Sequence, residues 1–107
     1  MNGKWELAKV DFFKGVSIEV FSTNPVMLKK LTDIVYDSVS QIGDEKIRVK
    51  KVHVINDFSN SILLSRTLIR QQFDTIRWTA HTLLCHEGWE PFGGGNYFAF
   101  KKYYECE

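Results

Sequence analysis

Residues 16–43 have the sequence VSIEVFSTNPVMLKKLTDIVYDSVSQIG, in which a strand pattern leads directly into a helix pattern. Apolar and polar residues alternate over the first positions, which is typical of a strand with one buried face. Thr23 or Asn24 can cap a helix, and Pro25 suits its first turn because no N–H donor is needed there. Gly43 is placed to end this helix. Its apolar face is formed by Met27, Leu28, Leu31, Ile34, Val35, Val39 and Ile42.

A second β-prone run, residues 5–13, precedes this stretch. Only Lys14 and Gly15 separate it from the strand predicted over residues 16–21, and this spacing predicts a tight hairpin. Hairpin connections join antiparallel neighbours. The chain is therefore expected to begin with an antiparallel strand pair that leads into the first helix.

The residues that follow the first helix predict a second pair of strands. Residues 46–55 are expected to form a strand and residues 56–60 a loop. Residues 61–70 fit neither a helical stripe nor strict alternation, and their β-branched content favours a strand. The sequence therefore predicts a strand, a loop and a second strand in the middle of the chain.

A second helix is expected from about Asp74, a suitable cap, to about Glu87, where Gly88 ends it. A turn over residues 91–95, which contain Pro91 and three glycines, leads to a closing strand over residues 96–105. The predicted order is thus β-β-α-β-β-α-β. Short connections favour one mainly antiparallel sheet with both helices on one face, an α+β fold.

Composition and charge narrow the class of protein further. The chain has 107 residues, 44% of them hydrophobic and 14% aromatic, which predicts one domain over residues 1–107 and argues against disorder. A net charge of +1 gives no general argument for binding nucleic acid or an anionic membrane. No apolar run approaches the length that spans a bilayer. We expect a cytoplasmic protein with no membrane association, in which Cys85 and Cys106 are reduced thiols.

One segment near the C-terminus carries a sequence motif. A helix end with the sequence Glu-Gly-Trp-Glu is followed by a strand rich in Tyr, Phe and Lys, and the residues are Glu87, Gly88, Trp89, Glu90, Tyr97, Phe98, Phe100 and Lys101. Over residues 83–104 the chain resembles a family of small bacterial and phage domains of unknown function, whose members also tend to start with a Trp-Glu strand, here Trp5-Glu6. The resemblance implies a small α+β sheet fold and supplies no catalytic residues. From the residues alone, Gly88 is expected to stop the helix and Trp89 to fold back onto the core.

The second helix has two faces, and we expect large apolar side chains on both of them to be buried. One stripe consists of Phe73, Ile76, Ala80, Leu83 and Leu84, and the other of Asp74, Trp78, His81 and Cys85. If the first stripe packs on the sheet, Trp78 needs another partner, such as a second copy of the chain or another protein. The alternative is internal burial, either by a sheet that curls around Trp78 or by residues 56–60 folded over it. Trp89 and Phe92, beside the glycine loop, are further candidates for an interface or a ligand cleft.

His81 and Cys85 share a helix face at a spacing that can present two metal ligands. A closed zinc site needs two more ligands, and no paired Cys-x-x-Cys motif supplies them. The same pair can act as nucleophile and base, but the sequence offers no orienting group. We therefore predict no metal and no cofactor, and we place a Cys/His-based enzyme third among the functions considered.

The second functional hypothesis is an interface for single-stranded nucleic acid. Aromatic rings flanked by cations on a sheet can stack and hold single strands. The candidate residues are Arg48, Lys50, Tyr97, Lys101 and Tyr103. The leading expectation is a small non-enzymatic binding or regulatory protein that acts through a homo-oligomeric or protein-partner interface. The open sheet face, or a cleft near the glycine loop, is expected to offer room for a ligand.

Overall fold

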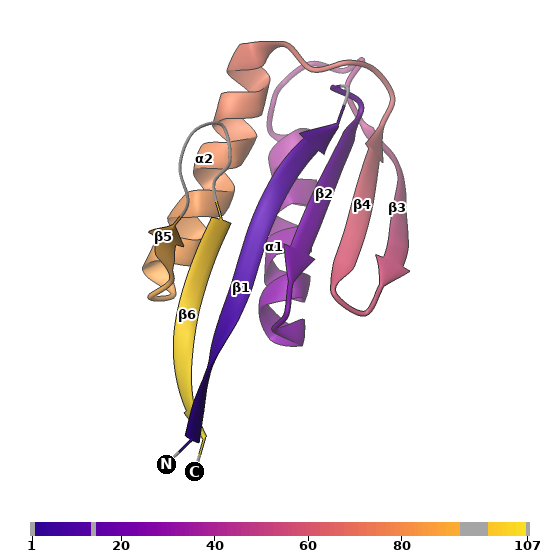
Figure 1. Ribbon diagram of the computed structural model, residues 1–107. Helices are drawn as coiled ribbons and strands as arrows, with labels where there is room; N and C mark the ends of the chain where they lie inside the picture. The colour runs from indigo at the N-terminus through magenta and orange to yellow at the C-terminus, as the bar shows by residue number, and fades with distance from the viewer. Residues whose placement is uncertain (1, 14, 93–98, 107) are drawn as a thin grey trace.

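The computed structural model describes residues 2–13, 15–92 and 99–106. In this part of the chain, strands and helices follow each other in the order ββαββαββ (Figure 1). The strands are β1 (Asn2–Phe13), β2 (Ser17–Ser22), β3 (Val49–Asn56), β4 (Ser59–Leu64), β5 (Glu90–Phe92) and β6 (Ala99–Cys106), and the helices are α1 (Pro25–Ser40) and α2 (Arg70–His86). The α+β class is confirmed, with one strand more than the sequence predicted.

The strands form one antiparallel sheet in the order β3-β4-β2-β1-β6-β5. Both helices lie on the same face of this sheet, as expected, and the other face is open (Figure 1). The long strand β1 pairs with β6 over residues 2–8 and with β2 over residues 8–13. Ala8 is therefore the position at which the two parts of the sheet meet.

The core lies between the sheet and the helices. The alternation in β2 places Ile18 and Val20 under α1, and both side chains are fully buried. The predicted apolar face of α1 is confirmed, because five of its seven residues are buried and the other two are half-buried: Met27, Leu28, Leu31, Val35, Val39, then Ile34 and Ile42. Neither described helix is long and apolar enough to cross a membrane.

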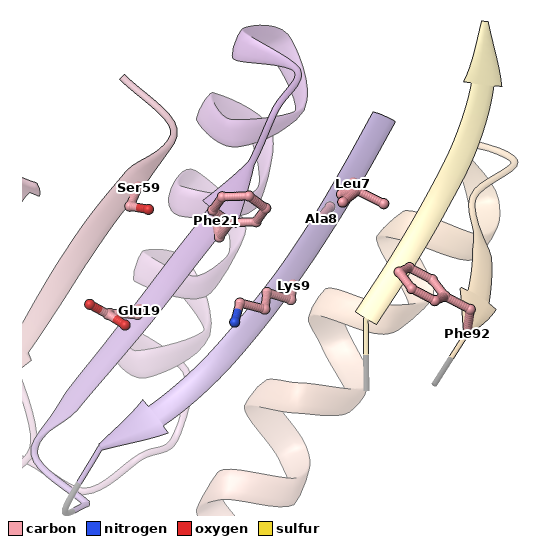
Figure 2. Close-up of a pocket in the computed structure, with 7 residues that line it drawn as sticks. All are labelled: Leu7, Ala8, Lys9, Glu19, Phe21, Ser59 and Phe92. Atoms are coloured by element: carbon pink, nitrogen blue, oxygen red, sulfur yellow. The ribbon is translucent and has the colours of Figure 1, made fainter. Parts of the chain in front are cut away.

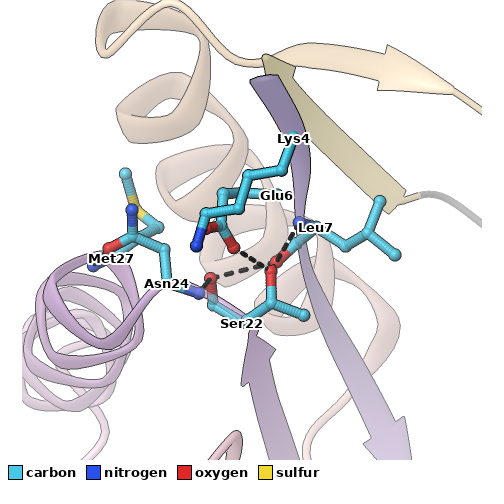
Figure 3. A network of polar contacts seen from close by, with 7 residues as sticks. Lys4, Glu6, Leu7, Ser22, Asn24 and Met27 are labelled. Atoms are coloured by element: carbon cyan, nitrogen blue, oxygen red, sulfur yellow. Dashed lines mark hydrogen bonds and ion pairs between the residues drawn. The ribbon is translucent and has the colours of Figure 1, made fainter. Parts of the chain in front are cut away.

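A polar network fixes the start of α1 to β1 (Figure 3). Thr23 Oγ1 donates a hydrogen bond to Glu6, accepts one from the N–H of Leu7 at 2.9 Å, and its own N–H donates to Leu7 O at 3.0 Å. Asn24, one of the two predicted caps, accepts from the N–H of Met27 at 3.1 Å. Because buried polar groups are costly unless paired, this network ties the helix to one place on the sheet.

Several boundaries differ from the sequence prediction. α1 ends at Ser40, before the stop expected at Gly43. The strand predicted from residue 46 starts at Val49, and the one predicted over 61–70 ends at Leu64. α2 begins one turn before Asp74, because the Gln72 side chain accepts a hydrogen bond from the N–H of Ile69 at 2.9 Å. A Gln that reaches back to the cap position satisfies a free N–H just as an Asp cap would.

Strand β5 was missed because Pro91 suggested a turn. In the structure Pro91 pairs in register with Phe100 at the edge of the sheet, where a residue without an N–H donor is tolerated. The predicted glycine loop, residues 93–95, and the first residues of the predicted closing strand, which include Tyr97, lie outside the described residues.

Candidate functional site on the outer face of α2

Helix α2 uses one face for the core and leaves the other uncovered. Ile76, Ala80 and Leu84 are fully buried, whereas 72% of Trp78 is exposed. Residues 56–60, the alternative cover for Trp78, form the β3–β4 turn at the far edge of the sheet. The two-faced helix predicted from the sequence is therefore present, and Trp78 has no cover within the described chain.

Trp78 stands between two hollows. The first, about 430 Å³, lies toward α1 and is lined also by Ile34, Thr79, Thr82, Leu83 and His86. The second, about 410 Å³, lies on the other side of the ring and is lined by Trp78, His81, Thr82, Cys85 and His86. A protruding indole with a recess on each side is a shape that can interlock with a partner surface of the same kind.

The threonines beside Trp78 have already satisfied their hydroxyl groups. Thr75 donates to Gln71 O at 3.0 Å, and Thr82 donates to Trp78 O at 2.8 Å. Thr79 donates to Thr75 O at 2.9 Å. These hydroxyl groups donate to carbonyl oxygens of the helix itself. A partner that covers this face would therefore leave none of the three without a hydrogen-bond acceptor.

His81 and Cys85 line the same hollow but differ in environment. The His81 ring packs on Phe100 with ring centroids 4.8 Å apart, and burial, reinforced by the nearby Arg77 charge, lowers the pKa of His81. Cys85 is exposed and carries a free thiol. Among the described residues that line this hollow there is no carboxylate to orient the imidazole. The described residues also contain no cluster of three or more side chains that could hold a metal ion.

The other expected site residues are not all on this face. Asp74 is exposed one turn before Trp78. Trp89 is only 3% exposed and packs edge-on against Tyr104, with ring centroids 6.3 Å apart. Phe92 lies on β5 and contacts the opposite side of the sheet from α2. The structure thus gathers Asp74, Trp78, His81 and Cys85, and it confirms the core role expected for Trp89.

The residues considered for nucleic acid are divided between distant strands. Lys101 and Tyr103 lie on β6, whereas Lys50 lies on β3 and Arg48 just before it. Three strands separate β3 from β6, which corresponds to roughly 19 Å at the usual strand spacing. Tyr97 lies outside the described residues. The described members of this set therefore form two separate groups.

Several residues of the α2 surface were missed in the sequence. Thr75 and Thr82 extend the exposed face on both sides of Trp78, and Ile34 reaches the first hollow from α1. The spacing 71, 75, 78, 82, 85 follows the alternating four and three of a helix-pairing seam, which was the available signal. The contribution of Ile34 to this surface could not be predicted from the sequence, because it depends on how α1 packs beside α2.

Comparison of the chain with protein-family models, curated proteins and solved structures finds no match.

Proposed function

We propose that this protein is a non-enzymatic, homodimeric binding protein whose two copies join through the outer faces of α2. The observation that carries the proposal is Trp78, which is 72% exposed between two hollows. Trp is among the residues most enriched at the centres of protein interfaces, because its ring buries a large area at a small cost in side-chain entropy.

An antiparallel pair of α2 helices fits the pattern of side chains. With the two-fold axis near residue 80, Trp78 of each copy faces Thr82 of the other, and Thr75 faces Cys85. A large side chain then lies opposite a small one at each step, which allows the helices to approach closely. The ring can enter the hollow lined by Thr79, Leu83 and Ile34 of the second copy.

The other proposed properties follow from the same face. A binding role suits the surface better than catalysis, because the hollow with His81 and Cys85 has no carboxylate among its described lining. An exposed free thiol at Cys85 suits a reducing compartment, so we propose a cytoplasmic location. The family resemblance over residues 83–104 stays a prediction, supported by the helix stop at Gly88 and the buried Trp89.

The mass in solution tests the dimer. Native mass spectrometry and light scattering of the wild-type chain should give twice the chain mass of 12.5 kDa. Trp78→Asp should give the single chain mass, because a charge at the centre of an apolar interface is costly to bury. Val26→Asp is the matched control: Val26 is 65% exposed on α1 and lies outside both hollows.

The outcomes separate the possibilities. A dimer that survives in Val26→Asp but not in Trp78→Asp, with unchanged circular dichroism, supports the proposal. A wild-type protein that stays monomeric at about 100 μM, a concentration far above the dissociation constant of a specific interface, would reject it. A dimer unaffected by Trp78→Asp would move the interface to another face.

A further inference from the structure

We propose that the open face of the sheet, opposite the helices, binds a small aromatic acid. Figure 2 shows the hollow on this face, which runs across β1 and β2 and reaches β4 and β5. It has a volume of about 420 Å³, which is in the range of small-molecule sites. This site is independent of the proposed dimer, because α2 lies on the other face.

The walls of the hollow are mainly apolar. Leu7 projects from β1, Phe21 from β2 and Phe92 from β5, and Ser59 adds one hydroxyl from β4 (Figure 2). Phe92 is 37% exposed although it is a large apolar ring. Aromatic rings at the sides of an apolar hollow favour a flat ring system, which can stack on one of them and meet the edge of another.

A cation that makes no ion pair with a described carboxylate lies beside the hollow. The Lys101 ammonium lies 4.5 Å from the centroid of the Trp5 ring and 5.6 Å from that of Phe92, and Lys101 is the register partner of Leu7. Among the described residues no carboxylate is within ion-pair distance of Lys101, although Glu90 on β5 is its other register partner. Lys9 lines the hollow itself, and its ammonium pairs with Asp11 at 3.0 Å. An ammonium held over rings is attracted to them but keeps its capacity to bind an anion.

These two features define the class of ligand. The rings accept a flat aromatic body, and Lys101 accepts an acidic group attached to it. A polyanion is less well matched, because Glu19 lines the same hollow and Asp11 lies beside it in register. One ring system with one acidic group therefore fits the charge of this face better than a nucleic-acid strand.

A titration with 2-naphthoate tests the proposal, with 2-naphthalenemethanol as the neutral compound of the same shape. We expect calorimetry to give roughly tenfold tighter binding of the acid, because one charge-assisted hydrogen bond is added. In ¹⁵N spectra of the wild-type protein, the amide signals of Leu7, Phe21 and Lys101 should move. Shifts centred on α2 instead would overturn the assignment of the site.

Two lysine variants isolate the charge. Lys101→Met keeps an unbranched apolar stem and removes the ammonium, so it should lose the preference for the acid and keep the binding of the neutral compound. Lys51→Met is the matched control. Lys51 lies on β3, at the far edge of the same sheet, and it pairs in register with the exposed Leu63. Equal losses in both variants would indicate general charge attraction and overturn the proposal.

Two further results would also reject it. One is the absence of any heat or shift with naphthoate up to millimolar concentration. The other is tighter, salt-sensitive binding of an eight-residue oligothymidylate that is lost in Lys101→Met, since this would assign the face to single-stranded nucleic acid.

Discussion

The three tryptophans show how the environment decides the role of a residue type. Trp89 is buried in the core, Trp78 is exposed on a helix, and Trp5 lies half-exposed on the open sheet face under the Lys101 ammonium. Burial makes the first a contributor to stability. The other two expose apolar rings. Trp78 carries the proposed dimer, and Trp5 holds the Lys101 ammonium beside the proposed ligand site.

Glu6 is a buried charged residue on β1. Its side chain, 8% exposed, accepts from Thr23 and pairs with Lys4 at 3.1 Å. The hydrogen bond from Thr23, with help from Lys4, lowers the pKa of Glu6 below its usual 4.5 even though burial opposes this. The folded state therefore favours the charged carboxylate.

Glu6→Gln should weaken the fold and change its response to acid. A lowered pKa means that Glu6 contributes stability above its unfolded pKa, and that this stability is lost as the pH falls through the folded pKa. We expect a loss of about 1–3 kcal/mol at pH 7 and a flatter decline of the unfolding free energy between about pH 5 and 3. Urea unfolding across this pH range measures both, with the exposed Glu45→Gln as the control.

At the scale of elements, the C-terminal end of α2 decides where the chain goes next. Gly88 has a φ of 86°, and the N–H groups of Gly88 and Trp89 bond to Cys85 O at 3.1 Å and Leu84 O at 2.9 Å. This pattern closes a helix with a left-handed glycine and turns the chain back, which carries Trp89 into the core. The face that α2 presents outward is fixed by the same ending.

The direction of the α2 pair can be measured by crosslinking. In a Cys106→Ser background, the antiparallel pair places residue 75 of one copy opposite Cys85 of the other, so Thr75→Cys should form a covalent dimer on mild oxidation. Disulfides require Cα atoms roughly 4.4–6.8 Å apart, which only facing positions reach. The background protein with Cys85 alone should stay uncrosslinked. Rapid crosslinking of that protein through Cys85 would indicate a parallel pair.

At the scale of the whole molecule, β1 joins two parts of the sheet. Ala8 is fully buried and is the register partner of both Ser22 on β2 and Phe100 on β6. Beyond it, β1 and β6 continue as a pair that brings the described ends of the chain side by side (Figure 1). The largest extent of the molecule is 51 Å.

A larger side chain at this joint should destabilise the whole molecule. Ala8→Leu adds volume where strands meet on both sides and helices cover the face, and overpacking of this kind costs about 1–3 kcal/mol. His53→Leu, which places the same side chain at an exposed position of β3, should change stability by less than about 0.5 kcal/mol. Urea denaturation distinguishes the two. Equal stability in both variants would show that the joint is loosely packed.

Much of the fold could be predicted from the sequence, because the patterns that determine it involve residues close together in the chain. The alternation in β2, the apolar face of α1 and the stop at Gly88 each depend on residues close in sequence. The errors fell where distant residues decide the outcome: β5 exists because Pro91 finds a pairing partner in β6. Trp78 and, on the open sheet face, Phe92 were candidates from the sequence, whereas Ile34, Leu7 and Phe21 were not.

The sequence by itself determined the α+β class, the identity of the long elements and the presence of a second face on α2 that carries Trp78. These properties follow from periodicity, which is a property of neighbouring residues. Only the tertiary structure decided that no described segment covers Trp78, that Lys101 lies over Trp5 and Phe92, and that Lys50 is far from Lys101. Strand order sets these relations, because it brings residues together that are distant along the chain.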